Sequence, residues 1–388
     1  MSKDGISIYF YAGDFVEAAR RYDAGESQSY ATHDELIRTF VELGSRGHRV
    51  DLYSLMEAES DAVVIAPNVT ATGLGGRHHR DPRLTAALKR DPNAAIVCHF
   101  PSLALHHAVW RTGKRGLSVL ADSFDRRSFR ARVNLFLLRH LLNSSAFEFV
   151  ANHGVPATKL LADAGVRREK LFPWNVPFAR TPRQHGSKRR EGGNRFSLCF
   201  VGSVIESKGV PDLIRAVAAS RGDSLIVDAK IVGRGDIPAM RQLAASLGVS
   251  EQVRFTGLLD NEEAFQVMRE SDAVVVPSRY SFQEGFPLVL FEALASRTPI
   301  ICSDHPIFAA AFTDGADALL FKAQDHQALL ARIRQLASDT ELYAALSSAA
   351  PMTWERVTAA ADWSTMIMEW AENGKNSSYL SEMARTYV

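Results

Sequence analysis

Short apolar runs alternate with amphipathic stretches along most of the chain, and this alternation constrains the fold more than any other feature. The runs are continuous rather than alternating, which is typical of strands buried on both faces of a parallel sheet. The intervening stretches, such as residues 34–47 and 210–220, have the apolar spacing of helices. The pattern predicts two doubly wound α/β domains in tandem. The expected strands are residues 6–11, 48–54, 62–67, 94–100, 117–121, 147–151, 196–202, 229–233, 253–257, 273–278, 298–303 and 318–321.

Between the two series of strands lies a stretch of different composition. Residues 180–194, RTPRQHGSKRREGGN, contain no apolar cluster and are rich in glycine, proline and charge. Such a composition is typical of an exposed linker. We therefore expect a first domain at residues 1–179, a linker at 180–194 and a second domain that begins at residue 195.

The near-neutral charge of the whole chain hides an asymmetry. The 388 residues include 45 Lys and Arg against 44 Asp and Glu. Residues 1–194 hold 28 basic against 20 acidic side chains, and residues 195–388 hold 17 against 24. Residues 101–190 alone carry 17 basic and 5 acidic side chains, which suggests that the first half faces an anionic partner. The pattern matches no nucleic-acid-binding module, so we expect no nucleic acid partner.

One segment of the basic half, residues 125–142, mixes arginines with large apolar side chains. One interpretation is an amphipathic surface that contacts the headgroups of an anionic membrane. The other is that the apolar side chains face the domain core while the arginines are simply solvated. The residues concerned are Arg126, Arg127, Arg130, Arg132 and Arg139 with Phe129, Leu135, Phe136, Leu137 and Leu138.

Other features favour a cytoplasmic protein, peripheral at the inner face of the membrane if the first interpretation holds. No apolar run approaches the ~18 residues of a membrane span, and the amino terminus lacks the pattern of a secretory signal. The three cysteines, Cys98, Cys199 and Cys302, lie in apolar, strand-like runs and predict buried thiols without disulfides. The sequence does not indicate an oligomeric state.

The most informative stretch begins at Glu284 and opens a predicted helix. Pro287 suits the first position of a helix, and the free N–H groups of Leu288 and Val289 would then form an anion site. Glu292 follows Glu284 by eight residues. Each carboxylate alone could be an ordinary surface acid, but the pair around a Gly-Phe-Pro turn predicts a ligand site.

A second candidate phosphate site follows the expected strand 196–202. Gly202 and Ser203 precede Lys208 and Gly209, and Lys208 could pair with phosphate oxygens as a point charge. The alternative is an exposed loop lysine. A dinucleotide fingerprint further on is weak, because the third glycine that it requires is replaced by Pro238.

Four motifs in order and spacing resemble the donor domain of the GT-B retaining glycosyltransferases of family 4, also called glycosyl transferases group 1. The resemblance implies two Rossmann-like domains facing across a cleft, with a nucleotide-sugar-binding second domain at residues 195–352. It also implies that helices in residues 353–388 return to the first domain. The motifs are Gly202 to Gly209, Val232 to Gly235, Phe255 to Gly257, and Glu284 to Glu292.

The resemblance implies a role for each matching residue. Lys208 would bind the donor diphosphate, together with the Leu288 and Val289 amides. Glu292 would accept from the ribose hydroxyls, and Glu284 would hold a hydroxyl of the transferred sugar. Further donor contacts are implied at Gly202, Ser203, Gly233, Leu259 and Phe286.

The resemblance also indicates the reaction. It implies a UDP- or GDP-sugar as donor and a hydroxyl of a glycan or lipid-linked saccharide as acceptor, in the synthesis of cell-surface polysaccharides or glycoconjugates. The sequence contains no Asp-x-Asp motif, so we expect a metal-independent reaction without a cofactor. The diphosphate would be the leaving group, stabilised by fixed donors and a lysine.

The first half departs from the family pattern. Many members have His-Asp where this chain has Ala121 and Asp122, so His99 is the nearest substitute for an active-site histidine. The alternative for His99 is a structural or acceptor-side role. Expected acceptor-side residues are Tyr30, His99, Asn152 and His153. Together with Ser203 in place of a common arginine, these departures keep a second hypothesis open: a non-catalytic relative that binds nucleotide sugar or glycan as a partner or scaffold.

Overall fold

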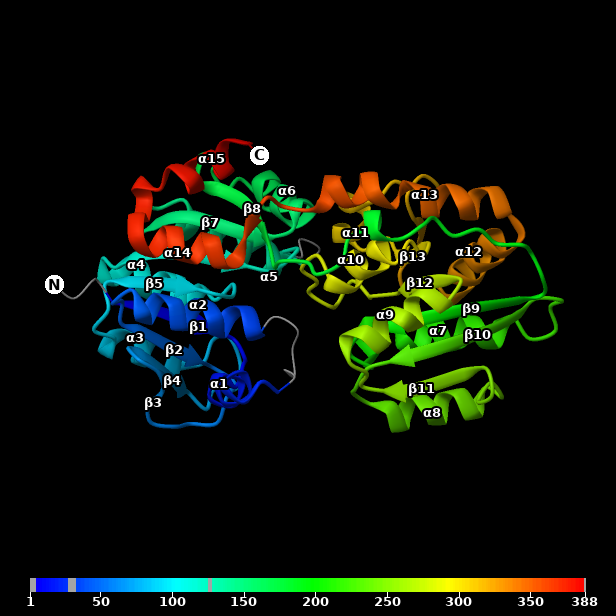
Figure 1. Cartoon of the computed structure of the whole chain (residues 1–388), viewed down its shortest axis with the longest axis horizontal. Helices are drawn as coiled ribbons and strands as arrows, with labels where there is room; N and C mark the ends of the chain where they lie inside the picture. The colour runs from blue at the N-terminus through cyan, green and yellow to red at the C-terminus, as the bar shows by residue number, and fades with distance from the viewer. Residues whose placement is uncertain (1–4, 27–32, 125–127, 387–388) are drawn as a thin grey trace. The chain divides into compact units, whose positions relative to one another are not determined.

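The chain is organised in two compact units, each built on its own sheet (Figure 1). The computed structural model describes residues 5–26, 33–124 and 128–386. The first unit combines the chain up to Pro177 with the chain from Ala359 onward, and the second spans Phe178–Thr358. Both sheets are flanked by helices, which confirms the predicted pair of doubly wound α/β domains.

The described part of the first unit forms a nine-stranded sheet in the order β15-β8-β7-β6-β5-β1-β2-β4-β3. All neighbours are parallel except β3, which runs antiparallel to β4. Strands β4, β8 and β15 were not expected from the sequence. The strands are β1 Ile6–Phe10, β2 Val50–Ser54, β3 Val63–Ala66, β4 Val69–Gly73, β5 Ala95–Cys98, β6 Arg115–Leu120, β7 Phe147–His153, β8 Leu171–Asn175 and β15 Ala361–Asp362.

Helices cover both faces of this sheet because alternate strand residues point to opposite cores. On one face Ile8 and Val97 pack with α1 Phe15–Ala24, α2 His33–Ser45, α14 Trp363–Asn373 and α15 Ser378–Thr386. On the other, Tyr9 and Ile96 pack with α3 Pro82–Arg90 and α4 Leu103–Thr112. Val150 continues that second face beside α5 Phe129–Leu142 and α6 Val155–Asp163.

Helices from the amino-terminal and carboxyl-terminal parts of the chain meet within the first unit, where α14 (red in Figure 1) runs beside α2 (blue). The Ser364 hydroxyl accepts from Thr39 Oγ1 at 2.8 Å and donates to Glu35 at 2.5 Å. Arg46 pairs with Glu372 at 2.8 Å. These contacts place the carboxyl-terminal helices on the first unit.

The second unit holds a six-stranded parallel sheet in the order β11-β10-β9-β12-β13-β14 among its described residues. The chain order reverses between β9 and β12, and ligands of doubly wound sheets bind at such a switch point. The strands are β9 Arg195–Val201, β10 Ile226–Val232, β11 Val253–Gly257, β12 Ala273–Val276, β13 Ile300–Ser303 and β14 Leu319–Phe321. The helices are α7 Val210–Ala219, α8 Ile237–Ser246, α9 Asn261–Glu270, α10 Leu288–Ala295, α11 Pro306–Ala311, α12 His326–Ser338 and α13 Thr340–Val357.

Both expected domain boundaries shift in the structure. The carboxyl-terminal change of unit falls at Thr358/Ala359 rather than after residue 352. Helix α13 continues to Val357 because Trp354 is packed against the rings of Phe178 and Phe291. Residues 180–194, expected as a linker, belong to the second unit.

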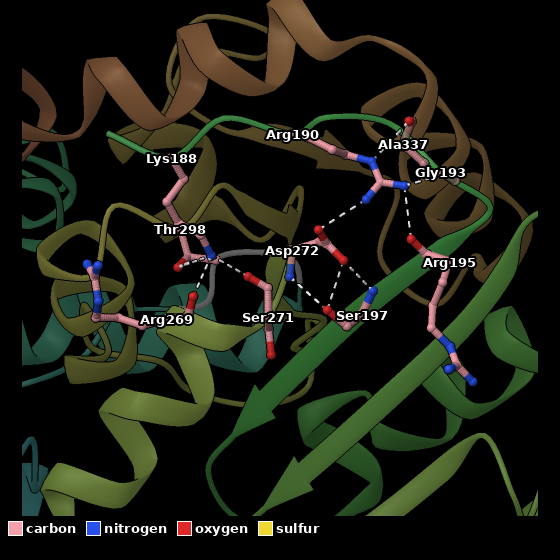
Figure 2. A network of polar contacts seen from close by, with 10 residues as sticks. All are labelled: Lys188, Arg190, Gly193, Arg195, Ser197, Arg269, Ser271, Asp272, Thr298 and Ala337. Atoms are coloured by element: carbon pink, nitrogen blue, oxygen red, sulfur yellow. Dashed lines mark hydrogen bonds and ion pairs between the residues drawn. The ribbon is translucent and has the colours of Figure 1, made fainter. Parts of the chain in front are cut away.

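Two basic side chains attach this segment to the second unit (Figure 2). The Lys188 ammonium donates to three oxygens at the ends of α9 and β13, and burial lowers the pKa of Lys188 to about 8. Arg190 pairs with Asp272 at 3.2 Å and also donates to three carbonyls. Asp272 in turn accepts from the amide and hydroxyl of Ser197. The charged groups of this segment therefore anchor it to the second unit.

The described part of the chain has no helix that is both long enough and apolar enough to span a bilayer. The three cysteines are buried and unpaired, as expected. Burial raises the pKa of the Cys98 and Cys302 thiols.

Candidate functional site

The loops after β9 and β12 meet at the switch point of the second sheet, and two predicted donor-binding side chains touch there. Lys208 ends a single 3₁₀ turn, Glu206–Lys208, in the loop after β9. Its Nζ lies 2.6 Å from Oε1 of Glu284, in the loop after β12. Both side chains are largely buried, with 16% and 4% of their surfaces exposed. The structure thus brings together two residues that lie 76 positions apart in the sequence.

Two neighbouring residues, which the sequence analysis missed, complete this contact. The buried Ser278 hydroxyl donates to the same oxygen of Glu284 at 2.5 Å. The Phe282 ring centroid lies 4.2 Å from Lys208 Nζ, a cation–π geometry. A signal for Ser278 was its place just after the buried strand β12, at the edge of the sheet where ligands bind.

Glycines in the predicted motifs allow the loops to approach closely. Gly209 has a φ of +76°, and a Cβ there would lie 1.9 Å from the carbonyl oxygen of Pro277. Gly233 has a φ of +137°, and its Cβ would lie 1.9 Å from the carbonyl oxygen of Gly202. These positions exclude any larger residue because the neighbouring backbone occupies the space.

Two further predicted donor contacts lie at the ends of β9 and β11, the strands on either side of β10. Ser203, after β9, is exposed, and Leu259, after β11, is partly buried. The Gly233 amide, which follows β10, donates to the Gly257 carbonyl at the end of β11 at 2.8 Å. This hydrogen bond joins the ends of those two strands. Both side chains are therefore at the carboxyl edge of the sheet, as the motif order predicts.

Side chains from neighbouring elements fix the loop between β12 and α10. Arg279 donates to both carboxylate oxygens of Asp212 at 2.8 and 2.9 Å and to Glu206 at 2.6 Å. Tyr280 donates to Asp304 at 2.6 Å. His305 Nε2 lies 3.1 Å from the carbonyl oxygen of Phe282. The loop that carries Glu284 is thus fixed from both sides.

The amino terminus of helix α10 lies at the end of this loop. It begins at Leu288, so Pro287 is the residue before the helix rather than its first residue, as was expected. No side chain caps the helix start. The Leu288 and Val289 amides therefore have no intrahelical acceptor and suit an anion. Phe286 is fully buried against Phe291 and Phe312, so its side chain belongs to the core.

Glu292, one turn into α10, is an acid in an unusual environment. Burial raises its pKa to about 7, an effect that the charge of Arg180 partly opposes. No described residue donates a hydrogen bond to its carboxylate. A partly desolvated carboxyl without a protein donor is suited to accept hydrogen bonds from ligand hydroxyls.

In the first unit, His99 follows β5, at the switch point between β5 and β1. Its Nε2 accepts a hydrogen bond from Trp363 Nε1 at 2.9 Å, and its ring packs beside Phe10 and Trp174. Burial lowers the pKa of His99 to about 4, so the ring is neutral near pH 7. The acceptor role of Nε2 leaves the proton of the neutral ring on Nδ1.

The other first-unit candidates lie at the ends of β6 and β7. The Asn152 side chain accepts from the Asp122 and His153 amides and donates to the Asp122 and Ala157 carbonyls, so its polar atoms all have partners. Asp122 is buried and accepts from the Phe124 amide at 2.6 Å. The His153 ring lies 4.8 Å from that of Trp174. Tyr30 lies outside the described residues.

Within the described ranges no group of three or more His, Cys, Asp or Glu side chains could hold a metal ion. His106 and His107 are adjacent histidines on α4, and only His106 lies in the core. His106 is buried, its ring nitrogens contact Ser102 and Ser118, and burial lowers its pKa to about 4.

A doubly wound sheet with a cation, buried carboxylates and an uncapped helix at its switch point defines a nucleotide-type binding domain. Residues 183–352, which contain this site, match the family model described as Glycosyl transferases group 1. The chain is 27% identical over 349 residues to D-inositol 3-phosphate glycosyltransferase of Nocardia farcinica, covering 78% of this chain and 75% of that protein. It is 32% identical over 238 residues to the enzyme of the same name from Actinosynnema mirum, covering 55% and 56% of the two chains.

Solved structures share the fold of the whole chain. HepE from Anabaena in complex with UDP-glucose has a TM-score of 0.63 at 17% identity, with 95% of this chain and 98% of that chain covered. WaaG, a glycosyltransferase involved in lipopolysaccharide biosynthesis, has a TM-score of 0.61 at 17% identity, with 99% of both chains covered. The fold is GT-B, and the sequence matches indicate a glycosyl-transferring enzyme.

Proposed function

We propose that the protein moves a sugar from a nucleoside diphosphate sugar to a hydroxyl of a glycan or lipid-linked saccharide. The observation that carries this proposal is the contact of Lys208 with Glu284 at the switch point of the second sheet. This site offers a cation and helix amides to a diphosphate, and carboxylates to sugar hydroxyls. The UDP complexes among proteins of similar fold support a uridine or related nucleotide in the donor.

The charges of the site fit the charge that develops during transfer. When the glycosidic bond to the diphosphate breaks, negative charge grows on the phosphate and positive charge on the sugar ring. Lys208 and the Leu288 and Val289 amides stabilise the first by fixed electrostatics. Glu284 is close enough to Lys208 to hold a hydroxyl of the sugar attached to that diphosphate. No step requires a metal ion, and the departing phosphate serves as base for the incoming hydroxyl.

Glu292 is the proposed ligand of the ribose hydroxyls. Two hydroxyl donors would replace the water that burial removes from its carboxylate and would favour the ionised form. Leu259 would contact the base from the end of β11. Retention of the anomeric configuration is part of the proposal, supported by the resemblance of the motif set to retaining enzymes.

The acceptor is assigned to the first unit, with Tyr30, His99, Asn152 and His153 as proposed lining residues and with His99 and Asp122 as proposed catalytic residues. His99 would act as a neutral imidazole because its pKa is far below 7. The basic character of this half fits an anionic glycan or glycolipid of a cell-surface pathway. We assign the protein to the cytoplasm, where its buried thiols stay reduced.

A donor screen tests the proposal. Thermal shift measured with nucleoside diphosphates and their sugars should identify one donor that raises the melting temperature, because a ligand of the native state stabilises it. Product analysis with that donor should then show transfer with a retained anomeric centre, unaffected by a chelator. Donor binding without transfer or hydrolysis would instead support a non-catalytic partner or scaffold, the alternative that Ala121 and Ser203 motivate.

A further inference from the structure

The two helical faces of the first unit differ sharply in charge. Helices α3, α4 and α5 contain seven Lys and Arg residues and no Asp or Glu. On the opposite face, α1, α2, α14 and α15 carry eight acidic and four basic side chains. The fourth helix of the basic face, α6, carries one of each, Lys159 and Asp163.

The three acid-free helices form one continuous surface, because α4 packs against both α3 and α5. We call this surface the basic face. The acids that flank the three helices, Asp81, Asp91 and Asp122, are buried, and Asp125 lies outside the described residues. Among the described residues, only Arg83 of the seven cations has a carboxylate within 4 Å, that of Asp81 at 3.8 Å. The cations are Arg83, Lys89, Arg90, Arg111, Arg130, Arg132 and Arg139.

Helix α5 adds an apolar stripe that faces away from the core. Four large apolar side chains are exposed, Phe129 by 75%, Phe136 by 52%, Leu137 by 47% and Val133 by 39%. At roughly 100° per residue they fall within one narrow sector of the helix. The buried Leu135, Leu138 and Leu142 lie in the opposite sector. Some apolar residues of this segment therefore fill the core, as the second interpretation expects, and others face solvent.

Arginines border the stripe on both sides. By the same helical geometry, Arg130 lies on one side of it and Arg132 and Arg139 on the other. The Arg139 guanidinium is 4.9 Å from the Phe136 ring centroid, so this cation contacts the edge of the stripe. On the neighbouring α4, Trp110 is half exposed. An apolar stripe between cations is the composition of a helix that lies in a membrane interface.

We propose that the basic face docks on an anionic lipid bilayer, with α5 along the headgroup layer. The Phe129, Phe136 and Leu137 side chains enter the boundary of the acyl region, and the bordering arginines bind lipid phosphates. Charge complementarity selects this occupant: seven clustered cations favour an anionic surface, and the apolar stripe distinguishes a bilayer from a soluble polyanion. The proposal concerns a surface and does not depend on sugar transfer.

Vesicle flotation of the full chain, without sugar donor or acceptor, tests the proposal. The wild-type protein should bind vesicles that contain phosphatidylglycerol, should not bind pure phosphatidylcholine, and should bind less as salt rises. Arg130→Glu with Arg132→Glu should weaken binding by about tenfold or more. Phe129→Ser with Phe136→Ser should also weaken it while leaving the melting temperature unchanged, because both rings are exposed.

Matched controls come from elsewhere on the chain. Arg38→Glu with Arg385→Glu reverses two exposed charges on the opposite face, and Val64→Ser with Met352→Ser removes two exposed apolar side chains. Neither control should change vesicle binding. Absence of wild-type binding to anionic vesicles would overturn the proposal, as would equal losses in control and test variants. Loss of self-association in Phe129→Ser/Phe136→Ser without any vesicle binding would assign the stripe to a second copy of the chain instead.

Discussion

The ammonium of Lys208 and the carboxylate of Glu284 lie 2.6 Å apart. Both are proposed to bind the donor, one its diphosphate and the other its sugar. The ion pair therefore uses hydrogen-bonding positions on both groups that the proposed donor would also use. Donor binding must exchange a buried ion pair for two charge-assisted contacts, which favours a ligand that offers both groups at once.

Glu284→Gln separates the two roles. The neutral amide retains a partner for Ser278 but releases Lys208 from the ion pair, so free UDP or GDP should bind severalfold more tightly. Transfer should fall by roughly 10–100-fold, because a hydrogen bond to a charged group is worth about 1.5–3 kcal/mol. Calorimetry with the nucleoside diphosphate and steady-state kinetics with its sugar measure the two effects. Weaker nucleotide binding in this variant would contradict the competition.

Phe282 positions Lys208 through its ring. Phe282→Leu keeps apolar volume but removes the ring, which loses about 0.5–2 kcal/mol of cation–π attraction. The resulting freedom of Lys208 should raise KM for the donor more than it lowers kcat. Phe282→Tyr retains a ring at the same place and should restore the wild-type KM. A tyrosine variant as impaired as the leucine variant would show that packing, rather than the cation–π contact, is what matters.

The sequence predicted both sheets because buried parallel strands read as continuous apolar runs. It missed β4, Val69–Gly73, where threonines alternate with apolar residues, and β8, whose run is interrupted by Pro173. The family resemblance implied that Lys208 and Glu284 serve one donor site, and both follow strands that meet at the switch point.

The partners Ser278 and Phe282 could not be predicted from spacing. Their placement depends on a loop conformation that Arg279 fixes through Asp212, 67 residues away. The anchoring of Lys188 and Arg190 was missed for a related reason. A polar, glycine-rich segment gives no hydrophobic periodicity, and its buried charges are matched only by oxygens brought together by the fold.

Gly209 should tolerate no side chain. Alanine there would meet the Pro277 carbonyl oxygen at 1.9 Å, in addition to the cost of a positive φ. Gly257 is the matched control, because its φ of +79° is nearly the same and nothing lies within 4 Å of the Cβ position. Gly257→Ala should cost about 1 kcal/mol of unfolding free energy, and Gly209→Ala more than about 3 kcal/mol. Denaturant melts of the two variants measure this; equal losses would refute the steric argument.

Arg190 should contribute to stability far more than its neighbour Arg189. The Arg190 side chain is only 6% exposed and pairs with Asp272, whereas Arg189 is exposed. Arg190→Met should destabilise the protein by about 2 kcal/mol, because Asp272 and three carbonyls lose a donor. Arg189→Met should change the free energy of unfolding by less than about 0.5 kcal/mol. Thermal melts at one pH compare them, and a similar small effect for both would show that the segment is not held by Arg190.

Glu292 should make donor binding and stability respond to pH in opposite ways. Its pKa is raised to about 7 by burial, so the folded state binds a proton more tightly than the unfolded state does. This term therefore destabilises the fold as pH rises from about 4.5 to 7, by on the order of 3 kcal/mol in total. Donor binding needs the ionised carboxylate to accept from ribose hydroxyls, so affinity should fall as pH decreases below 7.

The variant Glu292→Gln tests both effects of that carboxyl. The amide remains neutral, so the variant should be more stable than the wild type at pH 8 and about equally stable near pH 4.5. Its donor affinity should be lower at pH 8 and independent of pH between 6 and 8. Glu263→Gln, an exposed acid on α9, is the control and should leave the pH dependence of donor binding intact. A wild-type affinity that is flat across this range would exclude Glu292 as the ribose ligand, because no titrating carboxylate would then contact the donor.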